Sequence, residues 1–199
     1  MLDRRRIGMA ALRMADEQGV LTIPGLAKVL DVAPSALYHH VKGRAEIIAL
    51  MREELARETD INGPRFGTWR EVVEQWARAY LEAFAAHPGS IQIMATAPLS
   101  EPFMHRMYDS VAEQLSTAGF PVERVMPLIA ALENFVLGSA LDLVAPAVML
   151  SEIDRDATPH LSAALEHSPP DGQRARRAFD AGLEVMLTGL EALLSKAQE

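Results

Sequence analysis

The sequence contains no cysteine among its 199 residues. Without cysteine, neither a disulfide framework nor a thiolate metal site can form, and this absence fits a reducing cytoplasm. The sequence also has no G-x-S-x-G motif, no glycine-rich phosphate loop and no paired Glu/His motif of the kind that marks hydrolases or metalloenzymes. We therefore expect no catalytic residues, no metal ion and no cofactor, and we do not expect an enzyme.

The chain also lacks an unambiguous membrane segment. Residues 128–150 approach the length that spans a bilayer, but Glu133, Asp142 and Pro146 lie within this stretch and make a membrane location costly. Residues 1–19 carry charges inside their apolar run, which excludes a signal peptide. We expect residues 128–150 to form a buried helix of a soluble, cytoplasmic assembly that has no membrane partner.

Charge is distributed unevenly along the chain. The formal net charge is −8, which argues against nonspecific nucleic-acid binding by the chain as a whole. Residues 1–44, however, contain seven Lys and Arg residues against four acidic residues, so this part carries +3 and the remainder −11. Such an asymmetry arises by chance in some chains, but it also indicates a basic N-terminal part that meets a polyanion.

Apolar residues recur with helical spacing along almost the whole chain, and no run alternates with period two. We therefore predict an all-α fold with two domains, an N-terminal three-helix domain over residues 1–50 and a larger helical domain over residues 51–199. The predicted helices cover residues 4–17, 23–30 after a Thr22 cap, a third helix from Pro34, a fourth from Gly43 through Leu55, 68–86, 89–96, 99–118, 122–148, 159–166 and 173–196.

The second and third predicted helices are short and are joined by a tight turn at residues 31–33. This arrangement, with small and polar residues at the start of the third helix, is typical of a helix-turn-helix motif. Pro34, Ser35 and Ala36 form an edge slim enough for the major groove, where methyl groups meet thymine methyls and a hydroxyl meets base edges. The flanking side chains that supply hydrogen bonds and charge to phosphates are Tyr38, His39, His40, Lys42 and Arg44. The alternative is an ordinary packed tyrosine beside an exposed histidine pair.

The run LTIPGLAKVLDVAPSALYHHVKGRAEII resembles the DNA-binding domain of the TetR family of transcriptional repressors. The resemblance covers about the first fifty residues, and beyond them it is limited to the all-helical layout. The positions that carry it are Leu26, Ala27, Val32, Leu37, Tyr38, His40, Lys42, Arg44, Ala45, Glu46, Ile47 and Ile48. It implies phosphate contacts from Thr22, Tyr38, His40, Lys42 and Arg44, and base-edge contacts from Pro34, Ser35, Ala36 and His39.

Two features depart from the family's pattern, and the role of a third is open. Asp31 replaces the turn glycine, and aspartate tolerates the left-handed conformation less readily than glycine but better than most residues. Ile23 and Pro24 occupy positions where many relatives carry polar base readers, so we expect the second helix to read little sequence. The three arginines at residues 4–6 either form an arm that follows the DNA backbone or simply solvate the first helix.

Two long apolar helices, predicted at residues 122–148 and 173–196, need more partner surface than one subunit offers. In the second of them, Gly182 and Gly189 would let another helix come close. Its apolar stripe consists of Phe179, Leu183, Met186, Leu190, Leu193 and Leu194. We expect these helices to form a four-helix homodimer interface, as in the family, so that two recognition helices meet a near-palindromic double-stranded operator.

The middle of the chain gathers methionine and aromatic residues with few fixed charges, which suits an adaptable apolar cavity. The candidate ligand-binding residues are Trp76, Tyr80, Phe84, Met94, Phe103, Met104, Met107, Tyr108, Asn134 and Phe135. The alternative for each of them is a plain core position. We expect a dimeric repressor that a small apolar or amphipathic effector releases from DNA. The alternative function is a helix-turn-helix regulator without such an effector, controlled by a protein partner or acting as an activator.

Overall fold

The computed structural model describes residues 1–59, 66–167 and 172–197. The described residues contain helices and no strand, so the predicted all-α fold is confirmed. In chain order the helices are α1 (Arg4–Gln18), α2 (Ile23–Leu30), α3 (Pro34–Tyr38), α4 (Arg44–Glu58), α5 (Trp69–Ala86), η1 (Pro88–Ser90), α6 (Ile91–Ala95), α7 (Pro102–Ala118), α8 (Val122–Leu143), α9 (Pro159–Glu166) and α10 (Arg174–Ala197).

Prolines explain the helix ends that differ from the prediction. Helix α7 begins at Pro102 rather than at residue 99, because the fixed φ of proline suits the first helical turn. Helix α8 ends at Leu143 rather than at residue 148, since Pro146 disfavours helical conformation in the residues just before it. The single helix predicted at residues 89–96 is a 3₁₀ turn, η1, followed by the short helix α6.

Helices α1, α2 and α3 form a compact unit, which we call the head. The Thr22 hydroxyl accepts a hydrogen bond of 3.2 Å from the Gly25 backbone N–H, so the predicted cap of α2 is confirmed. Asp31 adopts φ 54° and ψ 51° in the turn before α3, the left-handed conformation that short polar residues tolerate. Leu26 and Leu37 are fully buried between the helices and hold α3 at a fixed angle to α2.

Helix α4 belongs to the packing of the head and also reaches the rest of the molecule. A Cβ atom added at Gly8 of α1 would lie 2.8 Å from the Leu50 carbonyl oxygen of α4, so the two backbones approach too closely for a side chain. Ile47 and Met51 of α4 are fully buried. The C-terminal half of α4 packs on α5 and α6. Helix α4 therefore connects the head to the remaining helices.

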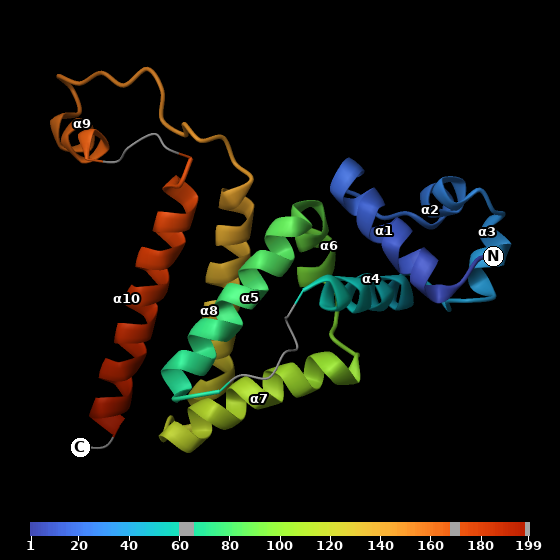
Figure 1. Cartoon of the computed structure of the whole chain (residues 1–199), viewed down its shortest axis with the longest axis horizontal. Coiled ribbons are helices and arrows are strands. Elements are labelled where there is room, and N and C mark those ends of the chain that lie inside the picture. The colour runs from blue at the N-terminus through green and yellow to red at the C-terminus, as the bar shows by residue number, and fades with distance from the viewer. Residues whose placement is uncertain (60–65, 168–171, 198–199) are drawn as a thin grey trace.

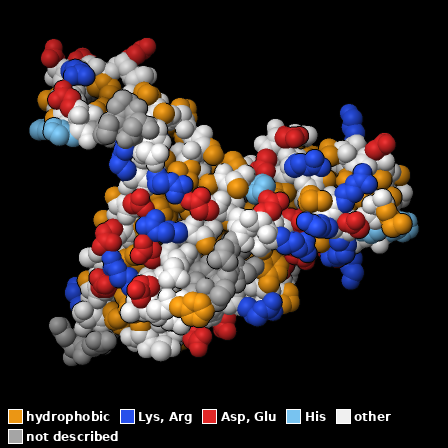
Figure 2. Space-filling model, in the orientation of Figure 1, with side chains coloured by type: hydrophobic (Ala, Val, Ile, Leu, Met, Phe, Trp, Pro, Cys, Tyr) orange, Lys and Arg blue, Asp and Glu red, His pale blue; other side chains and the backbone are white. Residues whose placement is uncertain are grey.

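Helices α5 to α10 form the body, which lies beside the head along the long axis of the molecule (Figure 1). Helix α5 packs on α8 and α7, and α8 packs on α10, so that α10 lies at the side of the body farthest from the head. Helix α9 stands apart from the other helices at one corner (Figure 1). Histidine, lysine and arginine side chains surround the outer end of the head (Figure 2).

The joint between head and body contains a histidine that bridges two carboxylates. His87, at the end of α5, contacts Asp16 of α1 through Nδ1 at 2.6 Å and Glu58 of α4 through Nε2 at 2.8 Å. Burial would lower the pKa of His87, but the hydrogen bonds and charges of the two carboxylates outweigh burial and raise this pKa above 6.5. The protonated imidazole can then donate to both carboxylates and tie the body to α1 and α4.

The contribution of His87 to stability should therefore depend on pH. Because the folded-state pKa is raised, the stabilisation is fully present below about pH 6.5 and is lost as pH rises through the folded-state value. We expect the difference in unfolding free energy between the wild type and His87→Ala to shrink from pH 6 to pH 9, as measured by urea denaturation at fixed protein concentration. The exposed His160 on α9 supplies the control, since His160→Ala should follow the wild type at every pH. A His87→Ala difference that stays constant or grows with pH would contradict this assignment.

Candidate DNA-binding surface and ligand cavity

Helix α3 presents its polar side chains to solvent and buries only one edge. Leu37 is fully buried, whereas Pro34, Ser35 and His39 are exposed and Tyr38 retains 55% of its accessible surface. Ala36 and His40 are half-buried beside them. The five-residue helix thus offers one narrow, exposed edge of small and polar groups, which is the shape that the major groove admits.

The segment between α3 and α4 is braced by Glu46. Its Oε2 atom accepts a 2.7 Å hydrogen bond from the Lys42 backbone N–H, and its Oε1 atom lies 2.5 Å from Arg4 Nη1 of α1. The Lys42 N–H and then Arg4 lower the pKa of Glu46, so the carboxylate stays ionised. Arg4 also donates to the His40 carbonyl oxygen at 2.9 Å. The brace fixes the backbone while the side chains of Lys42 and Arg44 remain exposed.

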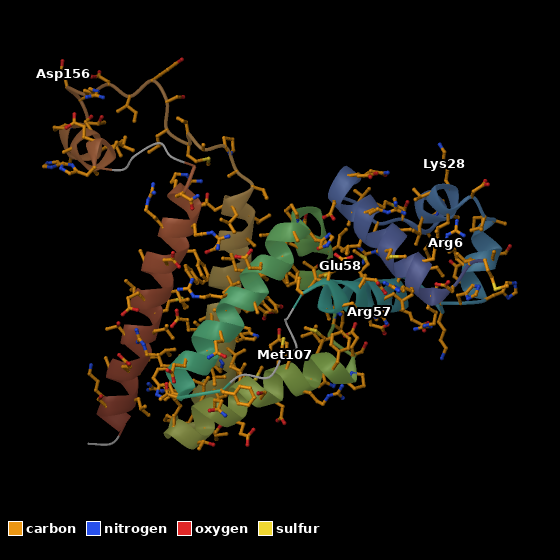
Figure 3. All side chains as sticks on the ribbon, viewed as in Figure 1. Arg6, Lys28, Arg57, Glu58, Met107 and Asp156 are labelled. Carbon is orange, nitrogen blue, oxygen red and sulfur yellow. The ribbon has the colours of Figure 1, made fainter. Side chains whose placement is uncertain are left out.

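The three arginines at residues 4–6 do not form an extended arm. They make up the first turn of α1, which Asp3 caps by accepting a 2.8 Å hydrogen bond from the Arg6 backbone N–H. Arg5 Nε lies 3.5 Å from Glu54 of α4. The arm interpretation is therefore wrong, because capping and ion pairs hold these residues in the helix. Arg6 and Lys28 mark the extent of the head in Figure 3.

Thr22 lies at the exposed start of α2. Its hydroxyl oxygen is engaged as the helix cap, but a hydroxyl that accepts one hydrogen bond can still donate its own proton. The geometry therefore leaves Thr22 able to donate to a phosphate.

The body contains a cavity of about 130 Å³ between α4, α5, α6, α7 and α8. The lining residues are Arg52, Leu55, Ala56, Tyr80, Phe84, Met94, Ala95, Ala97, Leu99, Met104, Tyr108, Glu133, Asn134 and Leu137. Six of the candidate ligand-binding residues are among them: Tyr80, Phe84, Met94, Met104, Tyr108 and Asn134.

The other four candidates lie outside the cavity wall. Trp76 is fully buried, with its ring 5.2 Å from that of Tyr80. Phe135 stacks on Phe179 of α10 with ring centroids 5.6 Å apart. Phe103 packs against the core, and Met107 is buried within it, between α5 and α7 (Figure 3). These four side chains do not line the cavity.

Arg52 is the largest polar feature of the cavity wall, and the sequence analysis missed it. Only 4% of its surface is exposed, and Nη1 lies 3.0 Å from an oxygen of Glu101, which is itself 5% exposed. The remaining partners of the guanidinium are the carbonyl oxygens of Met94, Ala97 and Pro98, at 2.7, 2.8 and 3.0 Å. Arg52 therefore fixes α4 to the α6–α7 connection. The sequence did contain a signal for Arg52. It stands four positions after Ile48 and three positions before Leu55, which puts a charged residue on the apolar face of the predicted helix.

Glu133 is the second charged residue on the wall. Its Oε1 atom accepts hydrogen bonds of 2.6 Å from both Tyr80 and Tyr108. Burial and the neighbouring Glu133 charge raise the pKa of both tyrosines above 10, so both phenols remain protonated donors. In the sequence this carboxylate was read only as an obstacle to membrane insertion.

A more open groove of about 410 Å³ adjoins the cavity. Leu99 and Tyr108 line both spaces, so these two side chains form the partition between them. The other residues of the groove are His105, Asp109, Ala112 and Met126. Across the described ranges, no group of three His, Asp or Glu side chains is arranged to hold a metal ion.

Comparison with known proteins extends the match well beyond the head. Residues 63–194 match the family model described as "Tetracyclin repressor-like, C-terminal domain", which covers more than half of the chain. The chain belongs to the TetR family of transcriptional regulators. The resemblance noted in the first fifty residues is therefore confirmed by an independent part of the sequence.

Relatives of this TetR-family chain are regulators of transcription. An HTH-type transcriptional regulator of Saccharopolyspora erythraea is 25% identical over 96% of this chain and 86% of its own length. The HTH-type transcriptional repressor DrrR1 of Streptomyces coeruleorubidus is 26% identical over 68% of this chain and 51% of its own length. Apo ActR of Streptomyces coelicolor shares the fold with a TM-score of 0.77 and 26% identity over 98% of both chains. Its complex with (S)-DNPA gives a TM-score of 0.71 at 27% identity, over 96% of this chain and 98% of ActR.

In this TetR-family chain, α8 and α10 leave apolar faces exposed. The exposed residues of α8 include Pro127, Ala130, Ala131, Gly138 and Leu141, and those of α10 include Ala178, Ala181, Val185, Gly189 and Ala192. A Cβ atom added at Gly138 or Gly189 would meet no atom within 4 Å, so these glycines open outward. At Gly182, in contrast, it would lie 2.6 Å from Phe135, so this glycine admits α8 of the same chain rather than a partner.

Replacing Arg52 should destabilise the protein strongly. The Arg52→Ala variant leaves the Glu101 carboxylate buried without its counter-charge and leaves three carbonyl oxygens without their donor. We expect the free energy of unfolding in urea, at fixed protein concentration, to fall by about 3–5 kcal/mol. The matched control is Arg155→Ala, which removes a wholly exposed pair with Glu166 and should cost less than about 1 kcal/mol. Equal losses for the two variants would show that the buried contacts do not stabilise the fold.

Proposed function

We propose that this chain is a dimeric, sequence-specific transcriptional repressor that a small ligand releases from a near-palindromic operator. The observation that carries the proposal is the position of α4. At one end, α4 packs in the head that exposes α3, and near the other end it contributes Arg52, Leu55 and Ala56 to the cavity wall. One helix thus connects the candidate reading surface with the candidate ligand site.

The exposed edge of α3 supports a role in reading DNA. Ser35 and His39 project from it as hydrogen-bonding groups for base edges, and Pro34 and Ala36 supply apolar contacts for thymine methyls. Thr22, Tyr38, His40, Lys42 and Arg44 surround this edge and are the candidate phosphate contacts. The Glu46 brace holds the loop that carries the last two cations, so their charges are presented from a fixed backbone.

The exposed faces of α8 and α10 support a twofold dimer. Both faces combine small and apolar residues, and their outward glycines allow close helix approach. Because α10 lies across the body from the head, pairing through these helices leaves both heads free (Figure 1). Two α3 helices could then enter successive major grooves about 34–36 Å apart, which requires a near-palindromic site.

The contacts of Arg52 support release by a ligand. A ligand in the cavity touches the α6–α7 connection, whose carbonyl oxygens Arg52 holds from α4. The ligand changes the position of the head only if it binds the protein more tightly with α4 in one position than in the other. The coupling free energy between two such binding sites is typically about 1–3 kcal/mol. The ActR complex with (S)-DNPA provides a structural relative that holds a small molecule.

One observation favours the alternative of a regulator without a small effector. The cavity of about 130 Å³ is smaller than the roughly 300–1,000 Å³ of ordinary ligand pockets. The two possibilities differ in a thermal-shift screen with purified protein, because an effector stabilises the folded state by mass action. Capture of bound genomic fragments tests DNA binding itself, and failure to enrich any shared sequence would contradict the proposal.

The phosphate contacts and the base contacts should respond differently to mutation. Lys42→Ala or Arg44→Ala should weaken binding to all DNA sequences alike and lower the salt slope of the binding constant by about one. Ser35→Ala should instead alter which bases are preferred, at about 1–3 kcal/mol per contact. Binding is measured by fluorescence anisotropy from 50 to 200 mM salt.

The control for these DNA-binding variants is Lys196→Ala, which removes the same charge from the end of α10. It should leave the salt slope unchanged, since that residue lies in the body far from the head. Slopes that are equal for Lys42→Ala, Lys196→Ala and the wild type would count against the phosphate contact.

A charge placed on the outer face of α10 should prevent dimer formation. Val185 is 72% exposed in the middle of this face, and in a twofold interface Val185→Glu would bury two like charges close together. We expect a monomer at micromolar concentration by sedimentation velocity. The control Val29→Glu makes the same change at an exposed position of the head and should leave the dimer intact. A dimeric Val185→Glu protein would refute this interface.

A further inference from the structure

The two charged side chains that line the cavity differ in whether an oppositely charged group is paired with them. Arg52 is paired with Glu101, and its terminal nitrogens also donate to three backbone carbonyls. Its positive charge is therefore already neutralised within the wall. Glu133 lines the same cavity and has no cationic partner among the described residues. The wall thus carries one uncompensated negative charge.

The hydrogen bonds of Glu133 leave part of its carboxylate available. Both phenols, from Tyr80 and Tyr108, donate to Oε1. In the part of the chain that the structure describes, Oε2 receives no hydrogen bond. A carboxylate that faces a largely apolar cavity without a counter-charge is unfavourable, and a bound cation would relieve that cost.

The surroundings of Glu133 are also those that a cation prefers. The rings of Tyr80 and Phe84 lie 4.8 Å apart beside it, and aromatic faces attract ammonium groups. Asp109 places another carboxylate in the adjoining groove, whose described lining contains no Lys or Arg.

We infer that the ligand of this cavity is a small organic cation, with an apolar body among the methionine and aromatic side chains and an ammonium group on Glu133 Oε2. This inference rests on the proposed ligand-gated function and specifies the chemical class of its ligand. An anion would meet the repulsion of Glu133, and a neutral ligand of the same shape would leave the carboxylate without a partner. The volume of about 130 Å³ is close to the roughly 150 Å³ of an apolar cavity that accommodates benzene, so the apolar body of the ligand is no larger than about one ring.

Three probes of nearly equal shape test the sign of the preferred charge. Benzylammonium, ethylbenzene and benzoate are titrated into the full-length protein at low ionic strength, and dissociation constants come from NMR chemical-shift changes. We expect benzylammonium to bind at least about tenfold more tightly than ethylbenzene, the size of one charged hydrogen bond, and benzoate to bind most weakly. If ethylbenzene or benzoate binds as tightly as benzylammonium, the inference is overturned.

Two variants then locate the charge that causes the preference. Glu133→Gln keeps the shape of the side chain and an oxygen that can accept from both tyrosines, but it removes the charge. We expect the ratio of the dissociation constant of ethylbenzene to that of benzylammonium to fall from about ten to about one. Glu113→Gln makes the same change at an exposed position of α7 and should retain the wild-type preference. A preference that survives in Glu133→Gln would overturn the assignment to Glu133, and the wild-type comparison of probes stands even where this variant does not fold.

Operator binding, measured on the wild type without a probe, separates this inference from the function on which it rests. A protein that binds a specific DNA site but shows no preference for benzylammonium overturns the ligand class alone. A protein that prefers benzylammonium but binds no DNA specifically supports the ligand class and overturns the proposed repressor.

Discussion

The buried guanidinium of Arg52 is the contact on which the arrangement of head, α4 and cavity depends. An arginine that is 4% exposed is tolerated only if its charge and its N–H groups are matched, because an unmatched buried charge costs several kcal/mol. Its partners come from the end of α6 and from the connection between α6 and α7, whereas Arg52 itself comes from α4. Helix α4 therefore cannot slide along this connection without breaking several hydrogen bonds together. A contact of this kind favours discrete positions of α4 over continuous ones.

The head follows α4 because the two share one core. The close approach at Gly8 packs the backbone of α1 directly against that of α4. Farther along, His87 joins the body to both helices through Asp16 and Glu58. The joint also contains close backbone packing, since a Cβ atom added at Gly89 of η1 would lie 2.3 Å from the Ala15 carbonyl oxygen of α1. One apolar core runs from the head through this joint into the body.

The features that were predicted correctly from the sequence are those that short-range interactions along the chain determine. The turn at Asp31, the cap at Thr22 and the exposed edge of α3 follow from short-range chemistry, and the structure has each of them. Which aromatic side chains face a cavity is decided by packing between distant helices, so Tyr80 lines it whereas Trp76 and Phe135 do not. Arg52 was not identified and Glu133 was read only as an obstacle to membrane insertion, because their partners are distant in the sequence. The partners of Arg52 lie 42 to 49 residues away, and those of Glu133 lie 25 and 53 residues away.

Helix α8 shows why composition alone is ambiguous. An 18-residue window of α8 reaches a mean hydropathy of 1.4, enough by length and composition for a membrane span, yet only 33% of that window is buried within the chain. Two of its three acidic residues contact other helices: Glu133 accepts hydrogen bonds from two tyrosines, and Asp142 pairs with Arg174 at 2.7 Å. A helix that packs on its own subunit with one face and on a second subunit with the other must be apolar on both. The hydropathy of α8 is what the proposed dimer interface requires, and the same helix contributes Glu133 to the cavity wall.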